Sequence, residues 1–188
     1  MKIGFLIPST TKGTKFKKLE DTYLFRFLIP SLLGTISTEH KYTLYLALDD
    51  DDKLYSKVQT KKKILNKDIY KKFNKNINLD IKVLSTKNID KGNVVGYWNM
   101  LFKKAYEDNN DYFVQCGDDI LFHNKGWLDL CIYHLILNMD LGVSAPVDVG
   151  NQSLMTQSVV SRKHMEIFGY YYPPELVSWF CDNWITDV

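Results

Sequence analysis

The chain has little cysteine, and this shortage excludes whole classes of small secreted and zinc-binding proteins. Its 188 residues include only three cysteines, Cys116, Cys131 and Cys181, and no two of them have CxxC spacing. An odd number of cysteines with apolar neighbours argues against a disulfide framework and against a thiolate zinc site. We therefore expect buried free thiols in a reducing compartment.

The chain also lacks long apolar runs and a strong net charge. Its N-terminus enters a strand-like segment at once, without the apolar stretch and cleavage site of a secretory signal. No apolar run approaches the roughly 20 residues that cross a bilayer. The formal charge is only +2, so no global field attracts nucleic acid or an anionic membrane. These shortages predict a cytoplasmic protein with no nucleic-acid partner and no transmembrane segment.

Ordinary globular composition is what remains, with 45% hydrophobic and 14% aromatic residues. A chain of this length can bury about 70% of the surface that it exposes when unfolded. No repeat or low-complexity linker divides it, which predicts one domain over residues 1–188. The chain stops without a polar tail, as though it were cut from a longer one.

Strand-like and helix-like segments alternate over the first two-thirds of the chain. The apolar patterns predict strands at 2–8, 42–48, 79–84, 112–114, 141–146 and 158–161. They predict helices at 19–33, 53–73, 93–107, 126–139 and 163–168, with Pro30 ending or kinking the first. Such alternation predicts an α/β fold, a sandwich whose mostly parallel central sheet is flanked by helices.

The most informative stretch is 111–122, where an apolar strand ends in Gly117 and two adjacent acids, Asp118 and Asp119. Ligands of open α/β sheets bind in the crevice outside the carboxyl ends of the strands. Two carboxylates there offer oxygen ligands to a divalent cation, which typically keeps waters and also contacts phosphate oxygens. The stretch therefore predicts metal-assisted handling of a diphosphate.

A second run of acids, Asp49 to Asp52, directly follows the strand 42–48. Nucleotide-binding α/β folds place an acid near this point of the chain to contact a ribose or base. Four acids exceed what the capping of one helix needs. We expect at least one of them, Asp49 or Asp50, to contact a ligand; the alternative is a solvated turn whose acids cap a helix.

The order of these segments resembles a known family. A strand followed by Pro8-Ser9-Thr10, a strand ending in acids, a helix with Gly96 and Asn99, and a strand ending in Gly117-Asp118-Asp119 resemble glycosyltransferases of the A-type (GT-A) fold. The family 2-like members of the nucleotide-diphospho-sugar transferase superfamily are the most similar. The resemblance implies a metal-dependent glycosyltransferase. It would move a sugar from a UDP- or GDP-linked donor to a hydroxyl of a glycan, glycolipid or protein, with inversion.

The resemblance also implies roles for individual residues. Asp118, with Asp119, would hold Mn²⁺ or Mg²⁺, and Asp119 would be a second ligand or a sugar contact. Asp182, in a late helix, would be the general base. The residues implied to border the nucleotide sugar are Pro8, Ser9, Thr10, Asp49, Asp50, Asp51, Asn93, Gly96, Asn99 and Gly117.

Two positions leave alternatives open. Cys116 stands where the family's metal motif has its first acid, and a thiol is a poor ligand for Mn²⁺ or Mg²⁺. The metal site is then completed by another group, or it is weak, or the acids cap turns around Gly126. Asp182 lies among aromatic residues that would raise its pKa toward the range of a base. The alternatives are a surface acid at a helix start, and Asp148 as a weaker rival.

Three further interpretations are weighed against these roles. His164 could complete a metal site, although a surface histidine on a helix is favoured. A nucleotidyltransferase acting on a sugar phosphate shares paired carboxylates, but it needs a glycine-rich basic loop of which 9–15 is a thin version. A catalytically inactive GT-A-like binding module is the non-enzymatic alternative, and Cys116 is the main argument for it.

Overall fold

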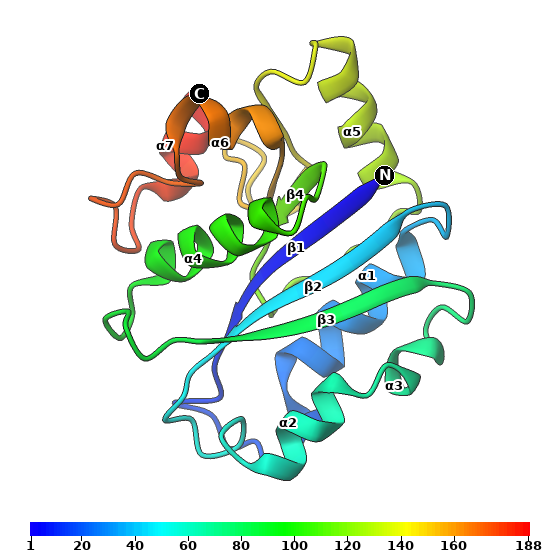
Figure 1. Ribbon diagram of the computed structural model, residues 1–188, viewed down its shortest axis with the longest axis vertical. Helices are drawn as coiled ribbons and strands as arrows, with labels where there is room; N and C mark the ends of the chain where they lie inside the picture. Colours follow the sequence, from blue (N-terminus) through cyan, green and yellow to red (C-terminus); the bar gives the residue numbers. More distant parts are fainter.

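The computed structural model describes residues 1–188, which form one six-stranded sheet with helices on both faces (Figure 1). The strands are β1 Lys2–Ser9, β2 Lys41–Leu48, β3 Asn78–Ser85, β4 Tyr112–Gln115, β5 Val143–Ser144 and β6 Ser158–Ser161. Their order across the sheet is β3-β2-β1-β4-β6-β5. Strands β1 to β4 are parallel, whereas β6 is antiparallel to β4 and to β5. The predicted α/β fold with a mostly parallel sheet is confirmed.

Successive side chains of the strands point to opposite faces of the sheet and pack into two separate apolar layers. In β1, Ile3, Phe5 and Ile7 enter one cluster, while Leu6 enters the other. The first layer is covered by α1 Ile29–Thr35, α2 Val58–Leu65, α3 Asp68–Lys71 and α5 Trp127–Leu137. The second is covered by α4 Val94–Glu107, α6 Arg162–Phe168 and α7 Cys181–Asp187. Because both faces are covered, the central strands β1 and β2 are apolar along most of their length.

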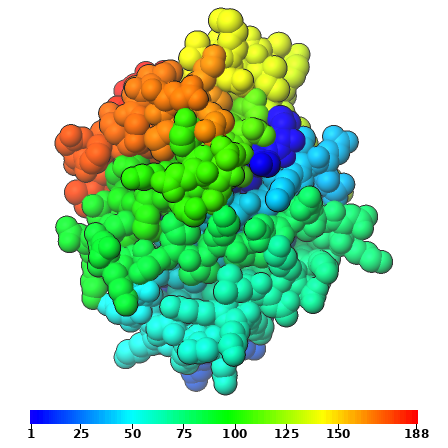
Figure 2. Space-filling view, viewed as in Figure 1, coloured from blue at the N-terminus to red at the C-terminus, as the bar shows by residue number.

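Helix α4 lies very close to the sheet, because Gly4 of β1 leaves room for it. A Cβ atom at Gly4 would lie 3.1 Å from the ring of Tyr45 and 3.3 Å from the Cβ of Ala105 in α4. In the space-filling view the C-terminal segments pack directly on α4 (Figure 2). Figure 1 shows α4 beginning beside the carboxyl ends of β2 and β3.

Three predicted elements differ from the structure. The predicted helix 53–73 is two short helices, α2 and α3, because the Asn66 side chain accepts a hydrogen bond from Asp68 N at 3.0 Å and so competes with helical bonding. The predicted helix 19–33 is a 3-10 turn at Leu19–Asp21, a π-helical segment at Leu24–Leu28 and then α1. Pro30 lies in the first turn of α1, which directly follows the π-helical segment. The predicted strand 141–146 is reduced to the two residues of β5.

All three cysteines are free and buried, as their apolar neighbours predict. None of the helices combines the length and the apolar composition that crossing a bilayer requires.

Candidate functional site

The strand order reverses at β1, which has β2 and β3 on one side and β4 on the other. At such a point the loops leave the carboxyl ends of neighbouring strands in opposite directions and open a crevice. The loops after β1, β2 and β4 carry Ser9-Thr10, Asp49–Asp52 and Gly117–Asp119. The structure thus brings to one edge of the sheet the polar segments that the sequence places far apart.

Asp118 lies at the centre of this edge and contacts β1. The hydroxyl of Ser9 donates a hydrogen bond to Asp118 Oδ2 and lies 2.8 Å from the hydroxyl of Tyr55. The pKa of Asp118 is raised to about 6, mainly by burial and also by the charge of Asp119, while the Ser9 hydrogen bond opposes the shift. Asp119 is exposed and has no hydrogen-bond or ion-pair partner. The two acids therefore form a carboxylate pair without any cation from the protein.

The chemistry of this pair fits a cation that is shared with phosphate. No three His, Cys, Asp or Glu side chains cluster anywhere in the chain, so the protein offers no complete metal cage. Cys116 is fully buried in the core, and burial raises its pKa far above the usual range, which keeps the thiol neutral and unsuitable as a ligand. Mg²⁺ and Mn²⁺ accept one or two carboxylates when phosphates and waters complete the shell. The N–H of Gly126 donates to Thr35 O at 3.2 Å, so Asp118 and Asp119 do not cap that turn.

The acids after β2 are in a different state, and Asp52 is the clearest case. Its carboxylate is fully buried. It accepts hydrogen bonds from Thr11 N at 2.6 Å, Thr11 Oγ1 at 2.8 Å, Leu54 N at 2.8 Å and Tyr55 N at 2.9 Å. These bonds outweigh the effect of burial and lower the pKa of Asp52. Asp52 therefore joins the loop after β1 to the loop after β2.

The other acids of this run are also paired. Asp50 accepts from Ser85 Oγ at 2.6 Å and from Thr86 N at 2.8 Å, which ties the end of β2 to the end of β3. Asp51 forms ion pairs with Lys12 and Lys91, and hydrogen bonds from these lysines lower its pKa to about 2.

Asp49 lies nearest the strand and lines a cavity. It accepts a hydrogen bond from Tyr97 OH at 3.2 Å and lies 3.2 Å from Lys12 Nζ. The cavity has a volume of about 320 Å³, and Asp50, Thr86, Lys91 and other residues of these loops complete its lining. Its mixture of carboxylates, a phenol and lysines beside the carboxyl end of β2 is suited to a polar heterocycle or sugar.

Asn93 and Asn99, which are predicted to contact the nucleotide sugar, form hydrogen bonds within the protein. Asn93 caps the helix by accepting a hydrogen bond from Gly96 N at 2.7 Å. The amide of Asn99 accepts from Tyr171 N at 2.9 Å and Tyr172 N at 3.0 Å, and donates to Tyr172 O at 2.8 Å. Asn99 thus fixes the segment that precedes α7 to the side of α4.

Asp182 and Asp148, the two candidates for a base, lie close enough to interact. Burial raises the pKa of Asp182, a hydrogen bond with Cys181 opposes this, and the charge of Asp148 adds to it. Asp148 itself accepts hydrogen bonds from Thr156 Oγ1 at 2.6 Å and Gly150 N at 2.7 Å, which lower its pKa. One carboxylate of the pair is held ionised while the other is made more basic.

The prediction of a surface position for His164 is wrong. The side chain is only 4% exposed, and its Nε2 donates to Tyr171 O at 3.0 Å. Its ring packs against Phe102 and Tyr171, so it serves the core and not a metal.

Sequence reasoning missed Tyr55 and Tyr97, which contact Ser9 and Asp49. Their partners lie 46 and 48 positions away along the chain, so no local pattern could identify them. The two lysines that pair with Asp51, Lys12 and Lys91, lie 39 and 40 positions away from it, so they were equally hidden.

Comparisons with known proteins place the fold. No protein-family model matches the chain, and no curated protein matches it in sequence. Among solved structures, a mannosyltransferase from Pyrobaculum calidifontis in complex with GDP-Man and Mn²⁺ is similar with a TM-score of 0.58 and 9% identity. The match covers 96% of this chain and 49% of that one, so the chain spans about half the length of the mannosyltransferase.

Two further structures are similar. A cytidylyltransferase from Leptospira borgpetersenii has a TM-score of 0.56 and 14% identity, over 100% of this chain and 71% of that one. A protein assigned as a nucleotide-diphospho-sugar transferase from Desulfovibrio desulfuricans has a TM-score of 0.51 and 14% identity, over 99% and 73%. The resemblance in fold is confirmed: the chain has a GT-A-like fold.

Proposed function

We propose that this chain transfers a sugar from a nucleotide-diphosphate-sugar donor to a hydroxyl acceptor, with Mn²⁺ or Mg²⁺ held by Asp118 and Asp119. One observation carries the proposal. At the edge where the strand order reverses, these two carboxylates have no cation from the protein, whereas Asp50, Asp51 and Asp52 are all paired. A pair of uncompensated acids in that position is suited to a ligand that brings its own cation.

The donor would lie along the edge from β2 to β4. The cavity beside Asp49 and Tyr97 would take the nucleoside, and the turn of Gly117 to Asp119 would face the diphosphate. When bound, the cation neutralises charge on the departing nucleoside diphosphate. The similar mannosyltransferase was solved with GDP-Man and Mn²⁺, which supports this class of donor and metal.

The acceptor side would use Asp182 as the base. As the acceptor oxygen forms its bond to the anomeric carbon, the bond from that carbon to the diphosphate breaks, and the hydroxyl proton moves to the Asp182 carboxylate. Direct displacement of this kind inverts the configuration. The raised pKa of Asp182 makes it a better proton acceptor, and the charge of Asp148 contributes to that shift.

Calorimetric titration with UDP, GDP and their sugar conjugates, with and without Mn²⁺, tests the proposal. We expect binding of at least one diphosphate that strengthens by tenfold or more with Mn²⁺ and that no longer responds to Mn²⁺ in Asp118→Asn. Diphosphate binding that is equally strong without metal would contradict the metal assignment. Absence of any nucleotide binding would favour the inactive binding module.

A nucleotidyltransferase is the second candidate, and a specific observation favours it. Beside the loop after β1 lies a cavity of about 550 Å³ whose lining has four lysines, Lys12, Lys17, Lys53 and Lys57, against two acids, Asp51 and Asp52. Its positive charge is suited to a triphosphate, and one of the similar structures is a cytidylyltransferase. The same titration separates the two functions, because a nucleotidyltransferase would bind CTP or another triphosphate more tightly than any diphosphate sugar.

A further inference from the structure

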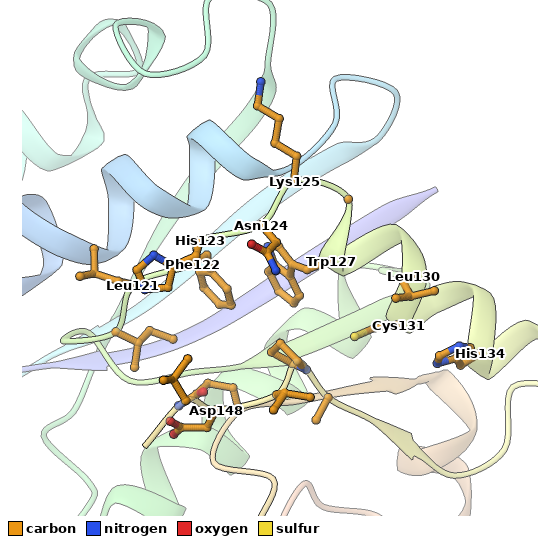
Figure 3. Close-up of a pocket in the computed structure, with 17 residues that line it drawn as sticks. Leu121, Phe122, His123, Asn124, Lys125, Trp127, Leu130, Cys131, His134 and Asp148 are labelled. Atoms are coloured by element: carbon orange, nitrogen blue, oxygen red, sulfur yellow. The ribbon is translucent and has the colours of Figure 1, made fainter. Parts of the chain in front are cut away.

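A cavity with a largely apolar surface lies beside the acidic edge (Figure 3). It has a volume of about 710 Å³. One wall is the segment from Ile120 through the start of α5, with Leu121, Trp127 and Leu130, and the facing wall is 145–149. Figure 3 shows Asp148 across the cavity from Phe122 and Trp127, whose rings stack with their centroids 4.2 Å apart. We call this cavity the α5 pocket.

The apolar lining of the α5 pocket is left open to solvent by the rest of the chain. Val147 and Val149 are 78% and 82% exposed, and Leu121 and Leu130 are about half exposed. Exposed apolar groups that gather in a concave site mark a binding surface more often than a scattered few do. Since no segment of this chain covers them, they are available to a ligand.

The position of the α5 pocket connects it to the candidate reaction. Ile120 in its wall directly follows Asp119. Gln157, on its other side, directly precedes Ser158, which pairs with Gln115 at the end of β4. The pocket is therefore bounded by the two segments that flank the acidic turn. Asp148 at its rim is the acid whose charge reaches Asp182.

We propose that the α5 pocket binds the apolar part of the acceptor, so that the acceptor joins an alkyl or aromatic group to a polar end that carries the reacting hydroxyl. This inference rests on the proposed sugar transfer. An acceptor seated there would bury its apolar part against Leu121, Trp127 and Leu130, and would direct its polar end toward Asp148 and the acidic turn. A purely polar oligosaccharide would leave the valine and leucine side chains of the pocket hydrated, so they would contribute little to its binding free energy.

Alkyl glucosides of increasing chain length, kept below their micelle concentrations, provide the test. Binding of methyl, hexyl and octyl β-glucoside would be followed by calorimetry, with UDP and GDP titrated separately with Mn²⁺. Burial of each methylene strengthens binding roughly fourfold. We therefore expect hexyl and octyl glucoside to bind far more tightly than methyl glucoside, and we expect the chain-length dependence to continue until the pocket is filled.

Exposed positions allow variants that leave the fold intact. Leu130→Gln and Val147→Gln would each reduce octyl glucoside binding about tenfold while leaving methyl glucoside and nucleotide binding unchanged. Leu65→Gln is the matched control, since Leu65 in α2 is 49% exposed against 56% for Leu130 and lies outside the pocket. Thermal unfolding would confirm that all three variants remain folded.

The outcomes separate the inference from the function on which it rests. Nucleotide binding without chain-length dependence would overturn the apolar pocket alone, as would equal losses in Leu65→Gln and Leu130→Gln. Chain-length dependence without any nucleotide binding would overturn both the acceptor role and the sugar transfer. Sedimentation could instead show a dimer that Leu130→Gln dissociates. If longer alkyl chains are then not preferred, the surface binds a second copy of the chain and the proposal is overturned.

Discussion

Two groups of acids lie at the same edge of the sheet, and they differ in how many hydrogen-bond and ion-pair partners the protein gives them. After β2, Asp52 is surrounded by donors from two loops, and Asp51 is paired with Lys12 and Lys91. After β4, Asp118 has only the Ser9 hydroxyl, and Asp119 has no partner. Carboxylates that are satisfied by the protein hold loops in place, whereas carboxylates left unsatisfied store repulsion that a ligand can relieve. Position at a strand end thus does not by itself identify a functional acid.

Asp118→Asn should have the largest effect of the variants that test this difference between the two groups of acids. Loss of a metal ligand should reduce kcat/KM for sugar transfer by at least about 10³-fold, because the cation supplies several kcal/mol of charge stabilisation. The fold should survive, since the substitution removes a half-buried charge that repels Asp119. Steady-state kinetics and thermal unfolding measure the two effects. Asp187→Asn, at an exposed position in α7, is the control, and equal activity of the two variants would sink the metal assignment.

A second test concerns Asp182, the proposed base. Asp182→Asn should lower kcat about 10²-fold to 10⁴-fold and leave nucleotide binding unchanged. Because the pKa of Asp182 is raised, the carboxylate is protonated at the acid end, so the acid limb of kcat/KM should lie above the ordinary aspartate range near 3.9.

Asp148→Asn is the companion variant for this pH profile. Removing the Asp148 charge should lower the pKa of Asp182 and move the acid limb to lower pH, with activity largely kept. If Asp148→Asn abolishes transfer and Asp182→Asn does not, the two roles are reversed.

Substituting an acid that the protein itself hydrogen-bonds should reduce stability instead of activity. Asp52→Asn keeps the shape of the side chain but adds donors where only donors surround it, which should cost about 2–3 kcal/mol of unfolding free energy. Asp68→Asn, an exposed acid paired with Lys71, should cost under about 0.5 kcal/mol. Denaturant unfolding compares the two, and equal stability would show that the Asp52 contacts are not structural.

The smallest expected effect comes from making the acids after β2 resemble those after β4, without a cation from the protein. Lys12→Met removes the cation that Asp49 and Asp51 share. Diphosphate binding should weaken about twofold to fivefold, and the difference should shrink in high salt because both groups are near solvent. Lys62→Met, in α2 and without an ion-pair partner, should change nothing; a loss there of the same size would point to net charge instead of the local pairing.

The fold could be predicted well because its signals are local. Apolar runs at 2–8 and 42–48 and the acids that follow them identify parallel strands and their carboxyl ends. The predictions failed where a side chain competes with the backbone, as Asn66 does in the predicted helix 53–73. They failed again at His164, whose burial depends on rings that lie elsewhere in the chain.

The candidate site was less predictable for the same physical reason. Whether Asp49, Asp50, Asp51 or Asp52 is free for a ligand depends on Thr11, Thr86, Lys12 and Lys91, which are distant in sequence. The α5 pocket did leave a signal: 127–137 is apolar on nearly every side, so some of its apolar residues, Leu130 among them, had to lie outside the core. A helix of that composition either meets a partner or binds a ligand.

The carboxylate shared between two loops also has an evolutionary consequence. Thr11 supplies both a backbone and a hydroxyl donor to the buried Asp52, so neither residue can change alone without leaving an unpaired polar group in the interior. In a set of related sequences, an acid at position 52 and a hydroxyl at position 11 should therefore be inherited together or lost together. Asp119 has no partner inside the protein, so only the requirements of a ligand should constrain which residue is found at position 119.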